Sequence, residues 1–164
     1  MVVLGLLALA AGCGDDDEQR STPAAATGLA NATVARVVDG DTIDVVVAGA
    51  RERVRLIGID TPEVARDDRD GECYGDEASA FTATVLPTGT QIRIERDIVG
   101  RDHYGRLLGY VHTTDGTFVN LEIVRRGFAT PLTIEPNSVH AREIAAAATA
   151  AERDDLGLWA TCAG

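Results

Sequence analysis

Alternation of apolar and polar positions begins at residue 33 and predicts a β-rich start to the folded region. Two segments rich in β-branched residues, 33–38 and 42–47, flank Asp-Gly-Asp at 39–41. An Asp-Gly pair between such segments is typical of a tight hairpin. Alternation continues over 53–59, which predicts a third strand after a short link. Together these segments predict an antiparallel β-meander.

The rest of the chain mixes helical and alternating patterns. Apolar residues at helical spacing predict helices over 75–86, 119–126 and 138–153, whereas residues 91–96 and 107–112 alternate and predict two further strands. Five strands, with a helix inserted after the third and two helices at the end, predict an α+β domain. A five-stranded OB-type β-barrel with three helices fits this count and order.

Local signals predict where two of the helices begin and end. Gly127 is expected to close the helix over 119–126, because glycine is favoured just after a helix. Asn137 or Ser138 is expected to cap the last helix, since either side chain can accept a hydrogen bond from a free backbone N–H group.

The chain starts with an uncharged apolar segment, residues 1–12, that ends at Cys13. This segment is shorter than the roughly 20 residues that a membrane-spanning helix needs, and it matches the apolar core of a secretory signal. Ala11-Gly12-Cys13 resembles a bacterial lipoprotein cleavage site, at which Cys13 would carry the lipid. A plain cleaved signal with an incidental cysteine is the alternative, and both interpretations predict export.

An acidic segment, residues 13–31, follows and shows no hydrophobic periodicity. Its small and charged residues are typical of a flexible tether. We therefore expect a domain over 32–164 that is held at the outer face of the membrane by the lipid alone, or that is secreted.

Composition narrows the class of protein. The 164 residues carry a net charge of −11 and are 45% hydrophobic, which favours one globular domain over a disordered chain or a multi-span membrane protein. The acidic balance argues against attraction of nucleic acid to the whole surface, but it is compatible with a local basic site. Every basic residue is arginine, whose planar fork is well suited to phosphate.

Two cysteines remain if Cys13 is lipidated. Because an exported protein permits disulfides, we expect Cys73 and Cys162 to pair and to tie the end of the chain to its middle. Two free buried thiols are the alternative. Neither cysteine has a partner at the spacing of zinc ligands, which disfavours a zinc site.

Five charged residues are candidates for a catalytic site. Asp41 and Asp60 lie at the ends of neighbouring predicted strands, so the meander brings two carboxylates to one rim, where a carbonyl and waters would complete a Ca²⁺ site. Glu63 follows closely enough to position or deprotonate a water near that metal. Arg55 and Arg106 offer two guanidinium groups to a phosphate. Phosphodiester hydrolysis needs this combination, although each motif alone is also typical of an ordinary turn or a solvated strand.

From Ala32 to about Trp159 the chain resembles the thermonuclease family, the staphylococcal-nuclease-like domains. The matching segments keep their order and near-equal spacing; they are residues 38–42 (Val-Asp-Gly-Asp-Thr), 55–56 (Arg-Leu), 59–63 (Ile-Asp-Thr-Pro-Glu), 74–81 (Tyr-Gly-Asp-Glu-Ala-Ser-Ala-Phe), 102–106 (Asp-His-Tyr-Gly-Arg) and 124–127 (Val-Arg-Arg-Gly). The fold of that family, an OB-type barrel with three helices, agrees with the elements predicted above.

The resemblance implies a Ca²⁺-dependent endonuclease that acts on single-stranded or frayed DNA and RNA and leaves 3′-phosphate ends. Asp41 and Asp60 match the family's calcium carboxylates, and Thr61 matches the residue that offers a backbone carbonyl to the metal. The catalytic trio of the family is matched by Arg55, Glu63 and Arg106.

The resemblance also covers the substrate site, but with departures. Tyr104 matches a residue that contacts a substrate phosphate, and His103 stands where a lysine would assist. In the stretch 130–135, where staphylococcal nuclease carries two tyrosines against the bound base, this chain has Pro131-Leu132-Thr133-Ile134. Since stacking contributes about 1–3 kcal/mol per base, we expect weaker substrate binding with the chemistry intact.

Three classes of function compete at this point. The first is an exported nuclease for extracellular nucleic acid, acting as a monomer without a protein partner. The second is a non-catalytic OB-type module that binds nucleic acid or another ligand at the cell envelope. The third is a structural envelope domain, which leaves the clustered site unexplained. A degenerate copy should have lost an acidic or arginine position of the site, and all five are present here.

Overall fold

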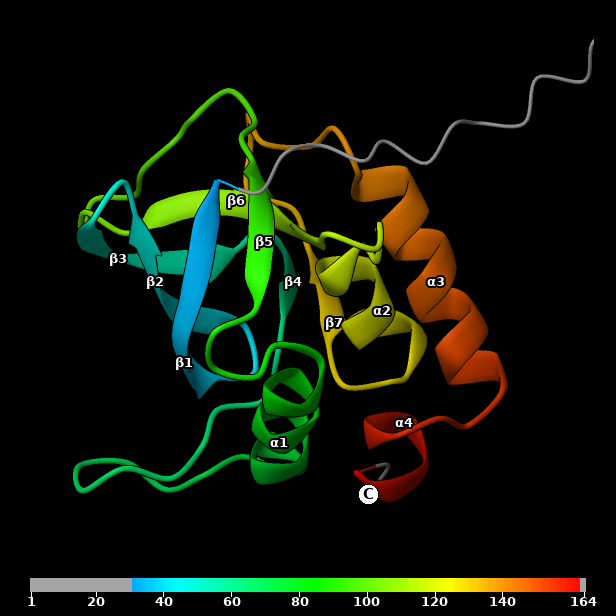
Figure 1. The fold of residues 1–164 in the computed structure, drawn as a ribbon. Helices are drawn as coiled ribbons and strands as arrows, with labels where there is room; N and C mark the ends of the chain where they lie inside the picture. The colour runs from blue at the N-terminus through cyan, green and yellow to red at the C-terminus, as the bar shows by residue number, and fades with distance from the viewer. Residues whose placement is uncertain (1–30, 163–164) are drawn as a thin grey trace, which may run out of the picture.

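The structure is a computed structural model that describes residues 31–162 of the chain. Five strands in this region close into a barrel in the order β1-β2-β3-β6-β5 (Figure 1). These strands are β1 (Ala32–Asp39), β2 (Thr42–Val47), β3 (Ala50–Leu56), β5 (Gln91–Glu95) and β6 (Leu107–Thr113). The predicted five-stranded OB-type barrel with helices is therefore confirmed. The predicted signal, Cys13 and nearly all of the predicted tether lie outside the described residues.

Strand pairing brings the first hairpin turn next to the third strand. The strands β1, β2 and β3 pair antiparallel in sequence order, which is the predicted meander. In the register of β2 with β3, Thr42 faces Arg55, so Arg55 lies directly beside the turn. The pairing of β3 with β6 is parallel and closes the barrel on its other side.

The prediction of one strand over 53–59 was wrong. The strand β3 ends at Leu56, and a separate strand, β4 (Gly58–Asp60), pairs antiparallel with β7 (Thr130–Leu132) in a small second sheet. Between β3 and β4, Ile57 does not pair with β2. Its N–H donates a hydrogen bond to Gly109 O, and its carbonyl accepts one from the side chain of Asn120. After this break, β4 is no longer part of the barrel and pairs with β7 instead.

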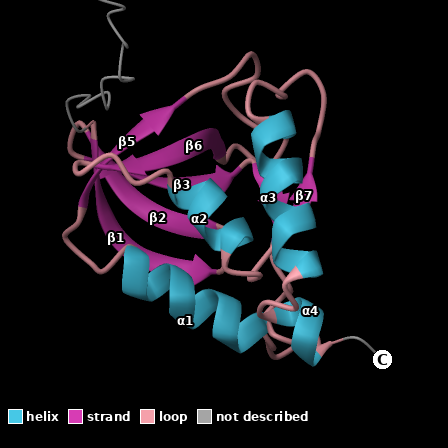
Figure 2. Cartoon of the chain, turned by 90° about the vertical axis from the view of Figure 1, so that its right-hand side faces the viewer, coloured by secondary structure: helices cyan, strands magenta, loops and turns pink. Residues whose placement is uncertain are grey.

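The described region contains four helices: α1 (Gly75–Val85), α2 (Val119–Arg125), α3 (Ala141–Arg153) and the short α4 (Leu158–Thr161), which contacts α3 and was not predicted. In Figure 1, α1 lies below the barrel and α2 lies between the barrel and α3. Figure 2 shows α1, α2 and α3 together on the side turned toward the viewer. None of these helices is long and apolar enough to cross a membrane.

The predicted cap of the last helix by Asn137 or Ser138 was wrong. The helix α3 begins at Ala141, and neither side chain caps it. Asn137 instead accepts a hydrogen bond from the N–H of Val99 at 2.8 Å and donates one to Val99 O at 2.9 Å. A buried amide that can pair with both backbone groups of a distant residue fixes two loops, which is a stronger constraint than one cap.

The core is mainly aliphatic, in keeping with the low aromatic content of the chain, 4%. Among the described residues, Tyr110 is the largest fully buried side chain; it belongs to one cluster with isoleucine, leucine and valine from the strands and helices, and its ring meets those of Phe118 and His140 edge-on. At the N-terminal boundary, Asn31 exchanges hydrogen bonds with the backbone of Ile94 on β5. This residue, placed in the predicted tether, is tied to the barrel.

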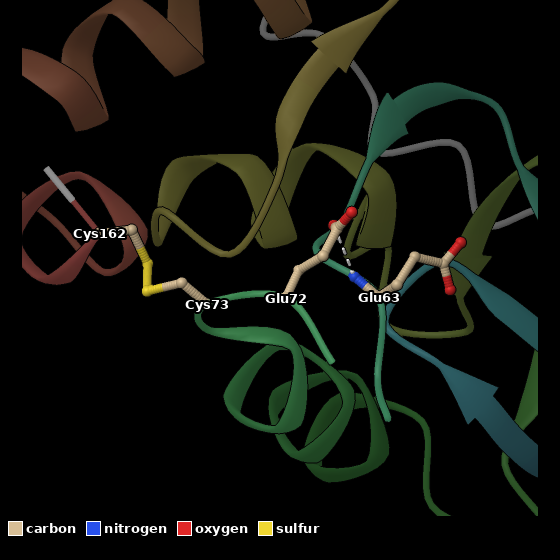
Figure 3. The surroundings of a disulfide bond; sticks show 4 residues. All are labelled: Glu63, Glu72, Cys73 and Cys162. Carbon is tan, nitrogen blue, oxygen red and sulfur yellow. Dashed lines mark hydrogen bonds between the residues drawn. A yellow bond between two sulfur atoms is a disulfide. The ribbon is translucent and has the colours of Figure 1, made fainter. Parts of the chain in front are cut away.

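A disulfide joins Cys73, just before α1, to Cys162, just after α4 (Figure 3). The two residues are 89 positions apart, and their Cα atoms lie 5.9 Å from each other. The bond therefore links the segment between β4 and α1 to the C-terminal end of the described chain.

Replacement of Asn120 by alanine is expected to lower the free energy of unfolding by about 3 kcal/mol, because it strands buried backbone partners. The fully buried Asn120 accepts a hydrogen bond from Val111 N–H at 2.9 Å and donates one to Ile57 O at 2.9 Å. Urea unfolding of Asn120→Ala measures the change. The exposed Gln91→Ala is the control and should cost less than about 0.5 kcal/mol; equal losses would contradict the assignment.

Candidate active site

The guanidinium group of Arg55 is the centre of the candidate site. Its Nη1 lies 2.9 Å from the carboxylate of Asp41, and its Nη2 lies 2.8 Å from that of Asp60. Nη1 also donates to the backbone carbonyls of Leu56 at 2.8 Å and Ile59 at 3.0 Å. The predicted convergence of the two carboxylates is thus observed, with one cation held between them.

The carboxylate of Asp41 is buried at the β1–β2 turn. One of its oxygens accepts hydrogen bonds from the N–H of Thr61 at 3.0 Å and from the Thr61 hydroxyl at 3.1 Å, and the other accepts from Thr42. Burial raises the pKa of Asp41 to about 6, against the opposing effect of Arg55. Burial thus disfavours the charged form of this carboxylate, and the positive charge of Arg55 partly offsets that effect.

The turn packs tightly against the end of β4. A Cβ on Gly40 would lie 2.6 Å from the hydroxyl oxygen of Thr61, so only glycine permits this approach. Behind the turn, the Thr82 hydroxyl of α1 donates to Gly40 O at 2.7 Å. The contacts hold Asp41 and Thr61 together, although these residues follow strands of two different sheets.

Arg106 is oriented by a neighbouring aspartate. The Asp102 carboxylate accepts hydrogen bonds from Arg106 Nε at 2.7 Å and from the N–H groups of Arg106 and Tyr104. The ring of Tyr104 is 74% exposed, with the Arg106 guanidinium 5.5 Å from its centroid and the His103 ring packed on it. Three predicted site residues thus share one short loop between β5 and β6.

Arg55 and Arg106 face the same cavity of about 400 Å³. His103 lines it as well, and its apolar wall includes Leu132 and Ile134 from β7 and the segment after it. Tyr104 lines instead an adjacent groove of about 670 Å³ that also reaches Arg106. Two guanidinium groups on one cavity can hold a phosphate from two sides.

Glu63 lies three residues beyond Asp60, on the segment that leads to α1. Its carboxylate forms an exposed ion pair with Arg69 at 3.0 Å, and its backbone is bonded to Glu72. The structure therefore places Glu63 next to the metal-ligand candidates along the chain, and gives it no hydrogen bond or ion pair to Arg55 or Arg106 within residues 31–162.

The predicted metal ligands fit a hard cation that keeps several waters. Among the described residues, no cluster of three or more His, Cys, Asp or Glu side chains is suited to a metal. Asp41 and Asp60 nevertheless already face one positive group, Arg55, and the partly exposed Asp60 is open to solvent. Calcium accepts such a set when a backbone carbonyl, here that of Thr61, and waters complete its shell.

Sequence reasoning missed the supporting residues of the site. Asp39 is buried, accepts a hydrogen bond from the N–H of Asp41 and pairs with Arg66 at 2.9 Å. Glu72 bonds the backbone of Glu63. Asp39 could have been found as the second carboxylate of the Asp-Gly-Asp turn, whereas no local pattern marks Glu72.

An OB-type barrel with two arginines on one cavity and two carboxylates in contact with one of these arginines fits a class of proteins that bind phosphodiesters. The comparison with protein families identifies the particular one. Residues 53–161 match the family described as staphylococcal nuclease homologue, and the chain belongs to this family.

Curated relatives carry matching names. The chain is 40% identical over 126 residues to a protein named thermonuclease from Staphylococcus intermedius, covering 77% of this chain and 74% of the relative. A thermonuclease from Staphylococcus hyicus is 36% identical over 144 residues, covering 85% and 84% of the two chains. Endonuclease YhcR from Bacillus subtilis is 37% identical over 151 residues, which are 87% of this chain but 12% of that relative.

Removal of the Arg55 side chain is expected to destabilise the domain by about 3 kcal/mol, because it leaves Asp41 as an unpaired buried charge. Urea unfolding of Arg55→Ala, without added metal, measures this loss. Arg53→Ala is the matched control, since Arg53 lies on the same strand and pairs with Asp44 in an exposed position. The free energy of unfolding of the control should fall by less than about 1 kcal/mol. Similar losses for both variants would show that Arg55 does not compensate the buried charge of Asp41.

Proposed function

We propose that the chain is a calcium-dependent nuclease that hydrolyses phosphodiester bonds of DNA and RNA outside the cytoplasm and leaves 3′-phosphate ends. Family membership and the thermonuclease and endonuclease relatives make it a nuclease, a hydrolase of ester bonds. The observation that carries the finer proposal is Arg55, held between Asp41 and Asp60 while it faces the cavity shared with Arg106.

Asp41, Asp60 and the carbonyl of Thr61 would hold the calcium ion. When bound, the ion supplies positive charge that offsets the charge on a non-bridging phosphate oxygen. The raised pKa of Asp41 supports this role, because a bound cation would offset the cost of keeping a buried carboxylate charged. The exposed side of Asp60 leaves room for the waters that calcium keeps.

Arg55 and Arg106 bind the phosphate and stabilise the charge that grows on it during hydrolysis. Both are oriented before substrate arrives: Arg55 by two backbone carbonyls and Arg106 by Asp102. An oriented guanidinium loses little freedom on binding, so more of its interaction energy remains for the transition state. Tyr104 and His103 extend the phosphate contacts along the same loop.

Glu63 positions the attacking water or accepts its proton. Its present partner, Arg69, forms an exposed ion pair, and such pairs contribute about 1 kcal/mol or less. The carboxylate can therefore exchange this partner for a water when substrate is bound. The leaving 5′ oxygen takes up a proton from solvent, and the phosphate remains on the 3′ side.

Export and membrane attachment belong to the same proposal. The apolar segment 1–12 and the cysteine that follows it support a lipoprotein signal, with Cys13 as the lipid site and the acidic segment as the tether. A disulfide between Cys73 and Cys162 is compatible with an oxidising compartment outside the cytoplasm. The enzyme would act there as a monomer on nucleic acid near the cell surface.

Cleavage of single-stranded DNA and RNA is expected with calcium and not with a calcium chelator, and Glu63→Gln should reduce the rate at least about 100-fold. Product ends, tested for removal of a 3′ phosphate by a phosphatase, measure the bond that breaks. Glu152→Gln, an exposed change on α3, is the matched control and should keep the wild-type rate.

A folded chain that binds calcium and nucleic acid without cleaving it would contradict the enzyme. The function would then be that of a non-catalytic OB-type binding module. Cleavage that persists in the chelator would contradict calcium dependence alone.

Replacement of Leu132 or Ile134 by tyrosine is expected to lower KM by about tenfold at unchanged kcat, because an aromatic ring on the cavity wall stacks on a base. These side chains are 37% and 68% exposed, so a larger ring fits without repacking the core. Steady-state kinetics at one fixed salt concentration make the measurement, since phosphate contacts depend on salt. Val46→Tyr, on the barrel away from this cavity, should leave KM unchanged; an equal effect would contradict a base site at β7.

A further inference from the structure

Glu72 bonds both backbone polar groups of Glu63. The backbone N–H of Glu72 donates to Glu63 O at 2.8 Å, and the Glu72 carboxylate accepts from the N–H of Glu63 at 3.0 Å. Figure 3 shows the Glu72 carboxylate turned toward the backbone of Glu63, while the Glu63 carboxylate points away from the disulfide. A side chain nine positions away therefore fixes the backbone from which Glu63 extends.

The partner of this backbone is itself covalently anchored. Cys73, the next residue after Glu72, is bonded to Cys162. Leu158, at the start of α4, donates its N–H to Gly127 O at 2.8 Å, and Cys162 at the other end of that turn donates to Leu158 O at 2.8 Å. The disulfide thus connects the Glu72 segment to a part of the fold that is hydrogen-bonded to the end of α2.

The anchor and the metal-ligand candidates border one hollow. A pocket of about 290 Å³ is lined by Asp60 and Thr61 and also by Glu72, Cys73 and Cys162. The segment between them, from residue 61 to residue 74, contains no helix or strand, apart from one isolated bridge between Arg66 and Arg69. Its path depends on single hydrogen bonds rather than on a sheet.

The start of α1 packs closely against the backbone of Glu63, so this backbone has no room to move toward the helix. A Cβ on Gly75 would clash with the carbonyl oxygen of Glu63, and the N–H of Gly75 donates to Glu72 O at 3.1 Å. Glu63 is therefore confined by the helix on one side and bonded by Glu72 through both of its backbone groups.

We propose that Glu72 is a positioning residue for Glu63, and that the Cys73–Cys162 disulfide keeps Glu72 in place, so that catalysis depends on this bond as well as on the groups that contact substrate. This role rests on the proposed function, in which Glu63 acts on the attacking water. A displaced Glu63 backbone moves its carboxylate away from that water, and small displacements of a reacting group reduce rates strongly. Substrate binding, which Arg55 and Arg106 provide, is left in place.

The first test separates positioning from folding. Glu72→Ala removes the acceptor, and kcat for cleavage of single-stranded DNA with calcium should fall about tenfold or more, while KM stays within about twofold. Glu72→Gln keeps an oxygen that can accept the same hydrogen bond, and it should retain kcat within about threefold of wild type. Loss of kcat in both variants alike would overturn a role through this hydrogen bond.

The second test addresses the disulfide. The double variant Cys73→Ser, Cys162→Ser should lower kcat by a factor similar to that of Glu72→Ala, and adding Glu72→Ala to it should lower kcat little further, since both changes release the same backbone. Ile92→Ala is the control for a loss of stability without a change at the site. Ile92 is fully buried and pairs with Ala32, which begins β1, whereas Asp39 ends that strand beside the site. At a temperature where all variants are folded, the control should keep the wild-type kcat, and a loss equal to that of the double variant would overturn the proposal.

A readout without substrate completes the design. Hydrogen exchange of the Glu63 backbone amide should be slow in the wild type and clearly faster in Glu72→Ala and in the double serine variant. Unchanged exchange would overturn the proposal. If the wild type cleaves and Glu63→Gln does not, while Glu72→Ala keeps its kcat, the positioning role fails and the proposed function stands. A wild-type chain that does not cleave would remove both.

Discussion

The site depends on a buried carboxylate that needs a positive charge. Asp41 lies under the first hairpin turn, where burial raises its pKa, and the guanidinium of Arg55 is the charge that compensates it. The register of β2 with β3 sets that guanidinium beside the turn, and the break after β3 brings Asp60 to its other side. Fold and site are thus coupled, because the pairing of β2 with β3 that builds the barrel also places Arg55 beside the buried carboxylate of Asp41.

Much of the barrel could be predicted from the sequence, because its strands alternate and are joined by turns with clear residue signals. The break at Ile57 could not, since the alternation continues through it and the bonds that cause it come from Gly109 and Asn120, far along the chain. The late start of α3 has the same origin, as the side chain expected to cap it pairs with Val99 instead. A local sequence pattern therefore fails to predict the structure where a distant polar residue forms more hydrogen bonds than the local partner does.

The candidate site divides in the same way. The charged side chains Arg55, Asp41 and Asp60 could be assigned from strand ends, and the structure brings them into direct contact. Glu63 and Arg106 were assigned too, but the side chains that orient them, Glu72 and Asp102, act across loops whose path no periodicity describes. The residues proposed to act in catalysis are therefore easier to predict from a sequence than the residues that position them.

The direction of β1 has a consequence for how the enzyme would meet its substrate. The described chain enters this strand at Ala32 and reaches the turn with Asp39 and Asp41 at its far end, eight residues later. At about 3.3 Å per residue, this is roughly 25 Å, close to the full height of a small barrel. The described chain thus joins the barrel at the end of β1 remote from Asp41 and Arg55, so a polymer that approaches these residues meets the opposite end of the strand from the point of entry.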